Sequence, residues 1–193
     1  MHKILTSMDS PLYIDIIVLP DSRGQIGMTF CPGKKDQGYS GIAYDRDLEI
    51  DLDVIASWGA EAVVTLLETI EMEMLWVTSL PDRLQKRGIE WHHLPIRDVD
   101  IPDSLFEEKW LDSGQRLKSI LSRGGKILLH CRGGIGRTGT IAAKLLVESG
   151  FEPVDAITKV RKARPGTIET KAQEQYVLKL KKVPARSAQS AAS

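Results

Sequence analysis

A chain of 193 residues favours one globular domain, because domains commonly hold about 100–200 residues. Its 26 lysines and arginines balance 26 aspartates and glutamates, so bulk charge gives no reason to expect a nucleic-acid or membrane partner. No stretch approaches the roughly 20 apolar residues of a membrane span, and no long apolar run precedes Asp15, as a secretory signal would require. We therefore expect a cytoplasmic protein, and its oligomeric state stays open.

The first half of the chain alternates patterns that are typical of strands and helices. Leu48, Leu52 and Ile55 lie on one face of a predicted helix that ends at Gly59. The expected strands are 12–19, 26–30, 62–67 and 89–94, and the expected helices are 46–58, 68–76 and 83–87. Strands that alternate with helices predict an α/β fold with a mostly parallel central sheet and helices on both of its faces.

The second half is richer in helix patterns. Ser104 and Glu107 have the spacing of a capping box, so we expect a helix to start there. The expected elements are helix 104–121, strand 127–129 and helices 141–148, 154–162 and 170–181. Residues 184–193 are rich in alanine and serine, which predicts a disordered tail.

A glycine-rich loop joins strand 127–129 to the next helix. Its sequence is His130-Cys131-Arg132-Gly133-Gly134-Ile135-Gly136-Arg137-Thr138. Strand, loop and helix N-terminus direct backbone N–H groups at one point, which suits a phosphate. Cys131 would lie beneath the phosphorus, and the planar fork of Arg137 would hold two phosphate oxygens. The loop amides, the helix N-terminus and Arg137 would also stabilise a thiolate, which makes Cys131 a nucleophile.

Other interpretations of the loop explain fewer of its residues. The segment from Gly134 to Gly139 also matches the dinucleotide pattern G-x-G-x-x-G, with Asp155 about 20 residues further on. No strand pattern follows to complete a nucleotide-binding half, and such a site has no use for Cys131 and Arg137. A cysteine buried only for packing would leave the spacing between those two residues to chance. The histidines and cysteines lack metal-ligand spacing, so we expect neither a metal nor another cofactor.

The loop resembles that of a known family. His-Cys-x5-Arg-Thr-Gly is similar to the active-site loop of cysteine-dependent protein tyrosine phosphatases, and most like the compact dual-specificity group with the cyclin-dependent kinase-associated phosphatases and their bacterial relatives. The resemblance covers roughly residues 25–180. It implies a dual-specificity-phosphatase-like fold and phosphoprotein substrates. We divide the chain into an N-terminal extension (1–23), a phosphatase domain (24–183) and the tail.

Attack of a thiolate on a phosphomonoester needs an acid that protonates the leaving oxygen, and the same group can then activate water. The candidates are Asp98, Asp100 and Asp103. The resemblance favours Asp98, because Pro95-Ile96-Arg97-Asp98 is similar to the acid pattern of the family. Asp100 has no distinguishing feature, and Asp103 also fits a cap or first-turn acid of the following helix.

Further roles follow from the resemblance. It implies that the Thr138 hydroxyl bonds to the sulfur, although a helix N-cap is the alternative. His130 is expected to brace the loop and lower the thiol pKa rather than to act as a general base. Arg132 is expected to be exposed, as in most such loops, where it either adds charge for an acidic substrate or is only solvated. Two glutamines that place the hydrolytic water in larger enzymes align with Glu169 and Gln173. Since the chain has glutamate at the first position, we prefer Gln173, with an ordinary first helical turn as the alternative. The loop residues expected to bind the phosphate are Arg132, Gly133, Gly134, Ile135 and Gly136.

The expected function is hydrolysis of phosphotyrosine, and of phosphoserine or phosphothreonine, in proteins through a phosphocysteine intermediate. A phosphoinositide or nucleotide phosphatase is the alternative within enzymes, but the loop lacks the lysines that lipid-directed relatives tend to carry. A phosphate-binding module without turnover is the alternative outside enzymes. Cys31 is either a structural cysteine or a redox partner of Cys131. A nucleophilic thiol favours a reducing compartment.

Overall fold

The computed structural model describes residues 3–37 and 41–182, so the expected tail lies outside the described residues. In this part of the chain the central sheet has five strands in the order β2-β3-β8-β6-β7. Their bounds are Asp15–Val18 (β2), Gln25–Phe30 (β3), Lys126–Cys131 (β8), Ala62–Thr65 (β6) and Glu90–His93 (β7). β8 pairs in parallel with β3 and β6, whereas β2 is an antiparallel edge strand. The predicted mostly parallel sheet is confirmed.

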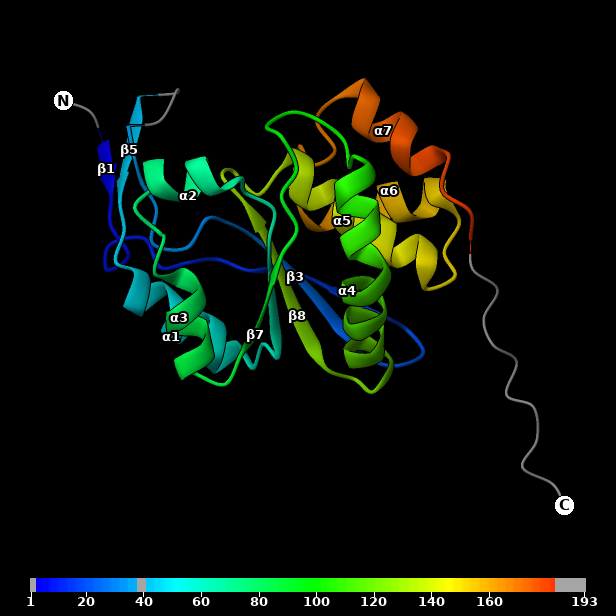
Figure 1. The fold of residues 1–193 in the computed structure, drawn as a ribbon, viewed down its shortest axis with the longest axis horizontal. Helices are drawn as coiled ribbons and strands as arrows, with labels where there is room; N and C mark the ends of the chain where they lie inside the picture. The colour runs from blue at the N-terminus through cyan, green and yellow to red at the C-terminus, as the bar shows by residue number, and fades with distance from the viewer. Residues whose placement is uncertain (1–2, 38–40, 183–193) are drawn as a thin grey trace, which may run out of the picture.

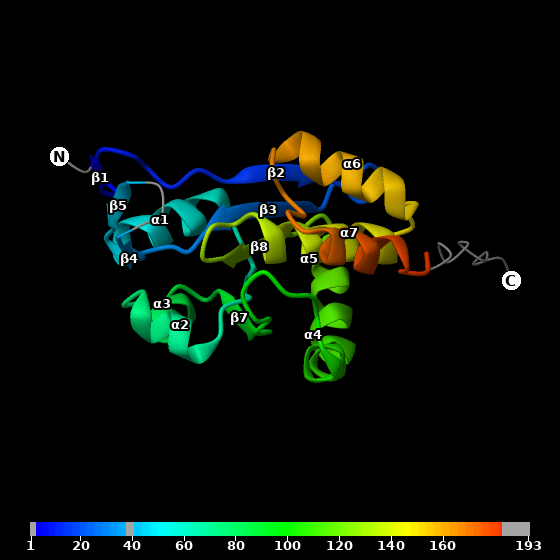
Figure 2. The same ribbon diagram turned by 90° about the horizontal axis from the view of Figure 1, so that it is seen from above.

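Helices cover both faces of this sheet (Figures 1 and 2). On one side lie α1 (Leu48–Trp58), α2 (Thr69–Met74) and α3 (Leu80–Lys86), and on the other α4 (Ser104–Ser122), α5 (Gly136–Glu148), α6 (Pro153–Ala163) and α7 (Lys171–Leu178). The middle strand, β8, contributes to the hydrophobic core on each face of the sheet. Leu128 packs on the side of α1–α3, whereas Ile127 and Leu129 pack on the side of α4–α7. No helix in the described residues is long and apolar enough to cross a membrane.

A second, smaller sheet was not predicted. It contains β1 (Lys3–Leu5), β5 (Ile42–Asp45) and β4 (Lys35–Asp36) in the order β1-β5-β4. These strands have two to four residues each, too short for a periodic sequence pattern. The segment expected as an N-terminal extension therefore contributes β1 to the small sheet and β2 to the central one.

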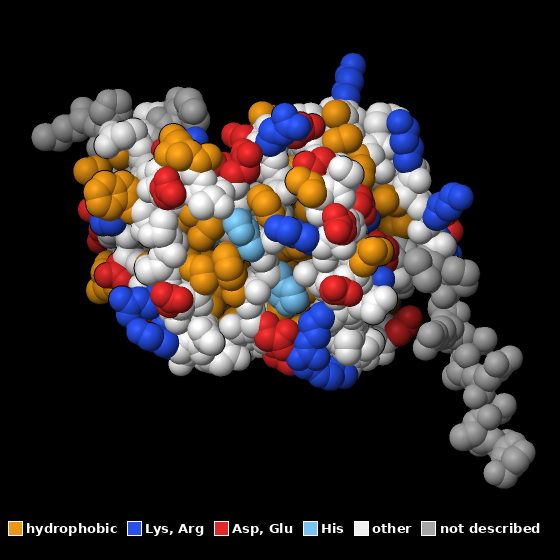
Figure 3. Space-filling model, in the orientation of Figure 1, with side chains coloured by type: hydrophobic (Ala, Val, Ile, Leu, Met, Phe, Trp, Pro, Cys, Tyr) orange, Lys and Arg blue, Asp and Glu red, His pale blue; other side chains and the backbone are white. Residues whose placement is uncertain are grey.

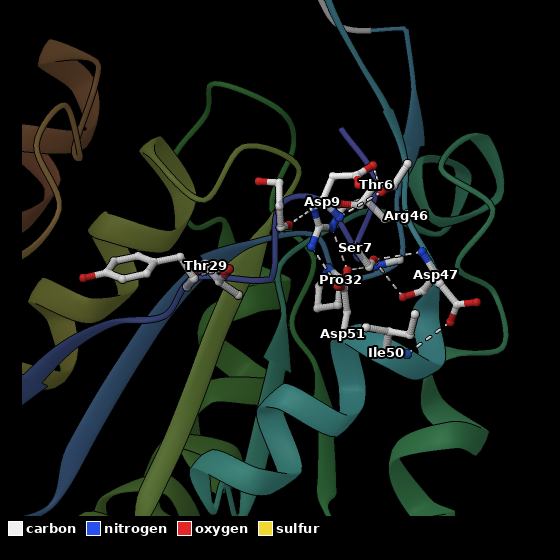
Figure 4. A network of polar contacts seen from close by, with 12 residues as sticks. Thr6, Ser7, Asp9, Thr29, Pro32, Arg46, Asp47, Ile50 and Asp51 are labelled. Atoms are coloured by element: carbon white, nitrogen blue, oxygen red, sulfur yellow. Dashed lines mark hydrogen bonds and ion pairs between the residues drawn. The ribbon is translucent and has the colours of Figure 1, made fainter. Parts of the chain in front are cut away.

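A buried ion pair ties the small sheet to the start of α1 (Figure 4). Arg46 donates from Nε and Nη2 to the two carboxylate oxygens of Asp51, at 2.8 Å each, and both side chains are fully buried. Asp51 also accepts the Gly33 N–H at 2.8 Å, and Arg46 Nη1 donates to the Ser10 carbonyl. This network holds Gly33 in place, and the following Lys34 and Asp36 bind Arg132 just beyond the end of β8.

The start of α4 corrects one detail of the sequence prediction. The N-cap is Asp103, whose Oδ1 accepts the Phe106 N–H at 2.9 Å, and Ser104 is the first helical residue. Glu107 makes no capping box and instead binds Lys144 Nζ at 3.0 Å. The capping role considered for Asp103 is thus confirmed.

Candidate active site

The glycine-rich loop lies between β8 and α5, at the carboxyl end of the central strand (Figure 1). Cys131 is the last residue of β8, is only 3% exposed, and its sulfur accepts the Gly134 N–H at 3.2 Å. Gly134 has a φ of 71°, and a Cβ there would lie 2.3 Å from the Thr29 carbonyl oxygen, so only glycine fits. The Gly134 N–H therefore points at the sulfur beside the N-terminus of α5.

Arg164 holds the outer side of this loop and was missed by sequence reasoning. Its guanidinium donates to the Gly134 carbonyl at 2.6 Å and to the Gly133 carbonyl at 3.1 Å, and it pairs with Asp15 of β2. In a trans peptide the N–H points opposite to the C=O. By turning the Gly133 carbonyl outward, Arg164 turns the next N–H inward, toward Cys131. In the sequence Arg164 precedes Pro165-Gly166 and marks only a turn.

Arg137 is buried and held as a fork by Glu71, a residue that carried no sequence signal. Nη1 donates to Oε2 of Glu71 at 2.6 Å, and Nη2 to Oε1 at 2.9 Å. Nη1 also donates to the Ile96 carbonyl at 3.0 Å. Burial acts to lower the pKa of Arg137, but the bond to Glu71 and the negative charges nearby outweigh it and raise the pKa above its usual value. The guanidinium is therefore charged and oriented before any ligand arrives.

The three candidate acids have different surroundings. Asp98 Oδ1 lies 2.8 Å from Arg137 Nη2, and the Asp98 side chain is 57% exposed. Asp100 Oδ1 accepts a hydrogen bond from the Ile101 N–H at 2.8 Å, and Asp103 caps α4. Of the three, the structure brings Asp98 to the arginine of the loop.

His130 belongs to a buried chain of hydrogen bonds behind the loop. Trp91 Nε1 donates to Thr65 Oγ1 at 2.9 Å, and the same hydroxyl is hydrogen-bonded to His130 Nε2 at 2.8 Å. Burial lowers the pKa of His130 to about 3, so the ring is neutral near pH 7. A neutral imidazole can brace the loop but adds no positive charge to it.

Thr138 differs from its expected arrangement. Its Oγ1 is buried and has no hydrogen-bond partner among the described residues, so a bond to the sulfur is not formed here. The N-cap alternative is wrong, because α5 begins at Gly136 with Ile135 as its N-cap. The hydroxyl is available inside the loop.

Arg132 was expected to be exposed, and this is wrong. It forms two bonds with Asp36, from Nε at 3.0 Å and from Nη2 at 2.8 Å, and its carbonyl accepts from the buried Lys34 Nζ at 3.3 Å. Burial lowers the pKa of Lys34. The small sheet brings both partners here, and since that sheet was not predicted, neither contact could be.

Gln173 and Glu169 reach the loop at Gly136. A Cβ on that glycine would lie 2.6 Å from Glu169 Oε1 and 2.9 Å from Gln173 Nε2. The Gln173 side chain forms a capping box with Thr170 at the start of α7, and its Nε2 donates to the Asp100 carbonyl at 3.1 Å. Gln173 thus joins α7 to the loop that carries Asp98, and its role toward water stays a prediction.

Cys31 lies close to the carboxyl end of β8, where its N–H bonds the Arg132 carbonyl, but its side chain packs in the other core. It packs with the α1–α3 side, whereas Cys131 packs with the α4–α7 side. Burial raises the pKa of Cys31 above its usual range, so this thiol stays protonated. These surroundings favour the structural role over the redox role.

An anion cradle with a cysteine sulfur at its base and an arginine fork at its rim defines a cysteine-dependent phosphatase site. The model of the DSP-PTPase phosphatase domain, described as PTP-SAK, Swiss Army Knife protein, matches residues 43–177. The chain belongs to this family of dual-specificity protein tyrosine phosphatases and is a protein phosphatase.

Named relatives agree with this assignment. Cyclin-dependent kinase inhibitor 3 of Rattus norvegicus is 31% identical over 176 residues, which is 88% of this chain and 79% of the relative. Human protein tyrosine phosphatase type IVA 3 is 32% identical over 120 residues, 62% of this chain and 64% of that one. A crystal structure of kinase associated phosphatase, with its catalytic-site cysteine replaced by serine, superposes with a TM-score of 0.75 and 28% identity over 87% of this chain and 93% of that chain.

Proposed function

We propose that this phosphatase removes phosphate from phosphotyrosine, and from phosphoserine and phosphothreonine, through a phosphocysteine formed on Cys131. The observation that carries the proposal is the Gly134 N–H directed at the Cys131 sulfur, beside the buried and charged fork of Arg137. A binding module would need the cradle but not a stabilised nucleophile. Because the reaction needs a free thiol, we place it in a reducing compartment such as the cytoplasm.

In the first step the Cys131 thiolate attacks phosphorus, an S–P bond forms and the ester P–O bond breaks. The loop N–H groups and Arg137 stabilise the negative charge on the equatorial phosphate oxygens. These donors are already oriented and need not move during the reaction. The departing oxygen takes a proton from Asp98. In the second step water attacks the phosphocysteine, Asp98 takes the water proton, and the sulfur leaves as a thiolate toward the Gly134 N–H. We assign Gln173 to this water because its amide reaches Gly136.

The ion pair between Asp98 and Arg137 suggests how the acid reaches the leaving group. Each terminal nitrogen of Arg137 has two N–H groups. Nη2 donates one to Glu71, and Asp98 Oδ1 lies 2.8 Å from the same nitrogen as an ion pair. A bound phosphate oxygen takes the place of the Asp98 carboxylate, which is exposed enough to move. Binding of the substrate therefore releases the acid at the position where the leaving oxygen emerges.

A trapping experiment tests this function. The protein is mixed with a ³²P-labelled phosphotyrosine peptide in the presence of EDTA and quenched with acid within milliseconds. We expect label on the tryptic fragment that contains Cys131, because hydrolysis of the phosphocysteine is a separate step. Phosphothreonine peptides and inositol phosphates run in parallel rank the substrate classes. Turnover that stops in EDTA, or label on any other residue, would contradict the proposal.

Replacing Arg137 with lysine tests the fork. Lysine keeps the charge but cannot bind Glu71 and phosphate with one plane, so we expect kcat/KM to fall about 100-fold, corresponding to about 3 kcal/mol of lost transition-state stabilisation. The matched control is Arg116→Lys, in an exposed pair with Glu90 on β7, which should keep its activity. Equal kcat/KM in the two variants would remove Arg137 from the phosphate site.

A further inference from the structure

A cavity of about 520 Å³ opens beside the glycine-rich loop that follows β8, which we call the phosphate loop. The cavity lies between α2 and the small sheet. Arg132 of the loop and Glu71, which holds Arg137, form its inner wall. Its outer wall includes Ile4, Met74 and Trp76, which are 58%, 62% and 75% exposed. Figure 3 shows hydrophobic side chains gathered over α2 and the small sheet on this face of the molecule. We call this cavity the α2 groove.

The charged side chains of the α2 groove are already paired. Lys35 binds Asp45 at 2.6 Å, Arg132 binds Asp36 at 2.8 Å, and Glu71 binds Arg137. A ligand would have to break one of these pairs to form an ionic contact. The exposed apolar side chains are in no ion pair that a ligand would have to break. We therefore expect the groove to bind a ligand through apolar contacts.

Trp76 adds an independent observation, because its backbone is strained without a gain in packing. Its φ is 62°, a left-handed value that is unusual for a bulky residue. It follows the end of α2 in a Schellman motif, with Trp76 N–H bonded to the Glu73 carbonyl and Val77 N–H to the Met72 carbonyl. Glycine usually occupies this position. The ring is nevertheless 75% exposed, so packing within the chain does not explain why tryptophan stands there.

We propose that the α2 groove is a substrate subsite that binds an apolar side chain within a few residues of the phosphorylated residue, with Trp76 and Met74 as its contacts. The proposal rests on the proposed function, since the groove is defined by its continuity with the phosphate loop through Arg132 and Glu71. An extended phosphopeptide with its phosphate on Arg137 runs over these residues into the groove. The subsite makes the enzyme prefer phosphoproteins with leucine-like or aromatic neighbours over small phosphate esters.

The test uses phosphotyrosine peptides in a serine background, with one leucine placed in turn at each of the three positions on either side. Wild-type enzyme should show a kcat/KM about tenfold higher for at least one leucine position, the scale of one apolar contact in a pocket. Trp76→Gly should remove that preference and leave kcat/KM for an aryl phosphate unchanged. Since glycine relieves the left-handed strain, the melting temperature should stay equal or rise.

Two further variants make the result decisive. Met74→Ser should weaken the same leucine preference, whereas Leu111→Ser, which alters an equally exposed residue of α4, should not. A leucine preference that is absent, or that survives both groove variants, would overturn the proposal. So would self-association in sedimentation that Trp76→Gly abolishes while the peptide preference persists, because the groove would then bind a second copy. Failure of the proposed function is distinct, since aryl phosphate turnover itself would be missing.

Discussion

Replacing Cys131 with serine is expected to abolish turnover, with kcat reduced by at least about 10⁴-fold, the scale for loss of a nucleophile that acts in a concerted site. The serine hydroxyl does not ionise near neutral pH, so it is a far weaker nucleophile than a thiolate. The Gly134 N–H and Arg137 are unaffected by the change. The variant should therefore still bind phosphopeptides.

The measurement combines single-turnover kinetics with calorimetric binding of a phosphotyrosine peptide. Cys31→Ser is the matched control, because it makes the same atomic change in the opposite core. We expect this control to keep the wild-type rate, and also to recover from peroxide as fully as the wild type once thiol is added. Substantial turnover by Cys131→Ser would refute the phosphocysteine.

Replacing Asp98 with asparagine is expected to lower kcat by roughly 10²–10⁴-fold for alkyl and tyrosyl phosphates, the usual share of general acid catalysis. Esters of strongly acidic phenols need no proton on the leaving oxygen and should lose far less. The basic limb of the pH–rate profile should flatten, because that limb reports loss of the acid's proton. Inhibition by free phosphate should become a few-fold stronger, since Asp98 no longer competes for Arg137.

Two neighbouring variants serve as controls. Asp100→Asn should keep the rate and the basic limb, and Asp103→Asn should do the same while lowering stability by no more than about 1 kcal/mol at the cap of α4. If Asp100→Asn instead produced the dependence on the leaving group, the acid would lie two residues further along the same loop. The rest of the mechanism would be unchanged.

Short-range pattern was sufficient to predict the central sheet, most helices and the loop from Cys131 to Arg137. A strand followed by clustered glycines is a local pattern that can be recognised in the sequence. A cysteine and an arginine separated by five residues in such a loop fit few kinds of active site. The position of Asp98 was inferred from a four-residue pattern, and its contact with Arg137 agrees with the proposed role. Its function as the acid stays a prediction.

The missed residues share a different origin. Glu71, Arg164 and Asp36 contact the loop from positions 30 to 96 residues away in the chain. Each belongs to a residue type that is common on surfaces, and nothing in its neighbours marks it as buried or paired. Only the folded arrangement of α2, α6 and the small sheet brings them to the phosphate loop. A single sequence therefore does not predict these long-range contacts.

The place of β8 in the sheet has a consequence for how the enzyme comes into being. β8 is the last strand of the central sheet along the chain, yet it lies in the middle and separates β3 from β6. During synthesis the pairs β2–β3 and β6–β7 have no common neighbour, and each exposes an open edge to aggregation. Closure then joins β8 to β3 across roughly a hundred residues, a slow kind of pairing. Cys131, the proposed nucleophile, is the last residue of that strand, so the appearance of activity in a refolding experiment reports completion of the whole sheet.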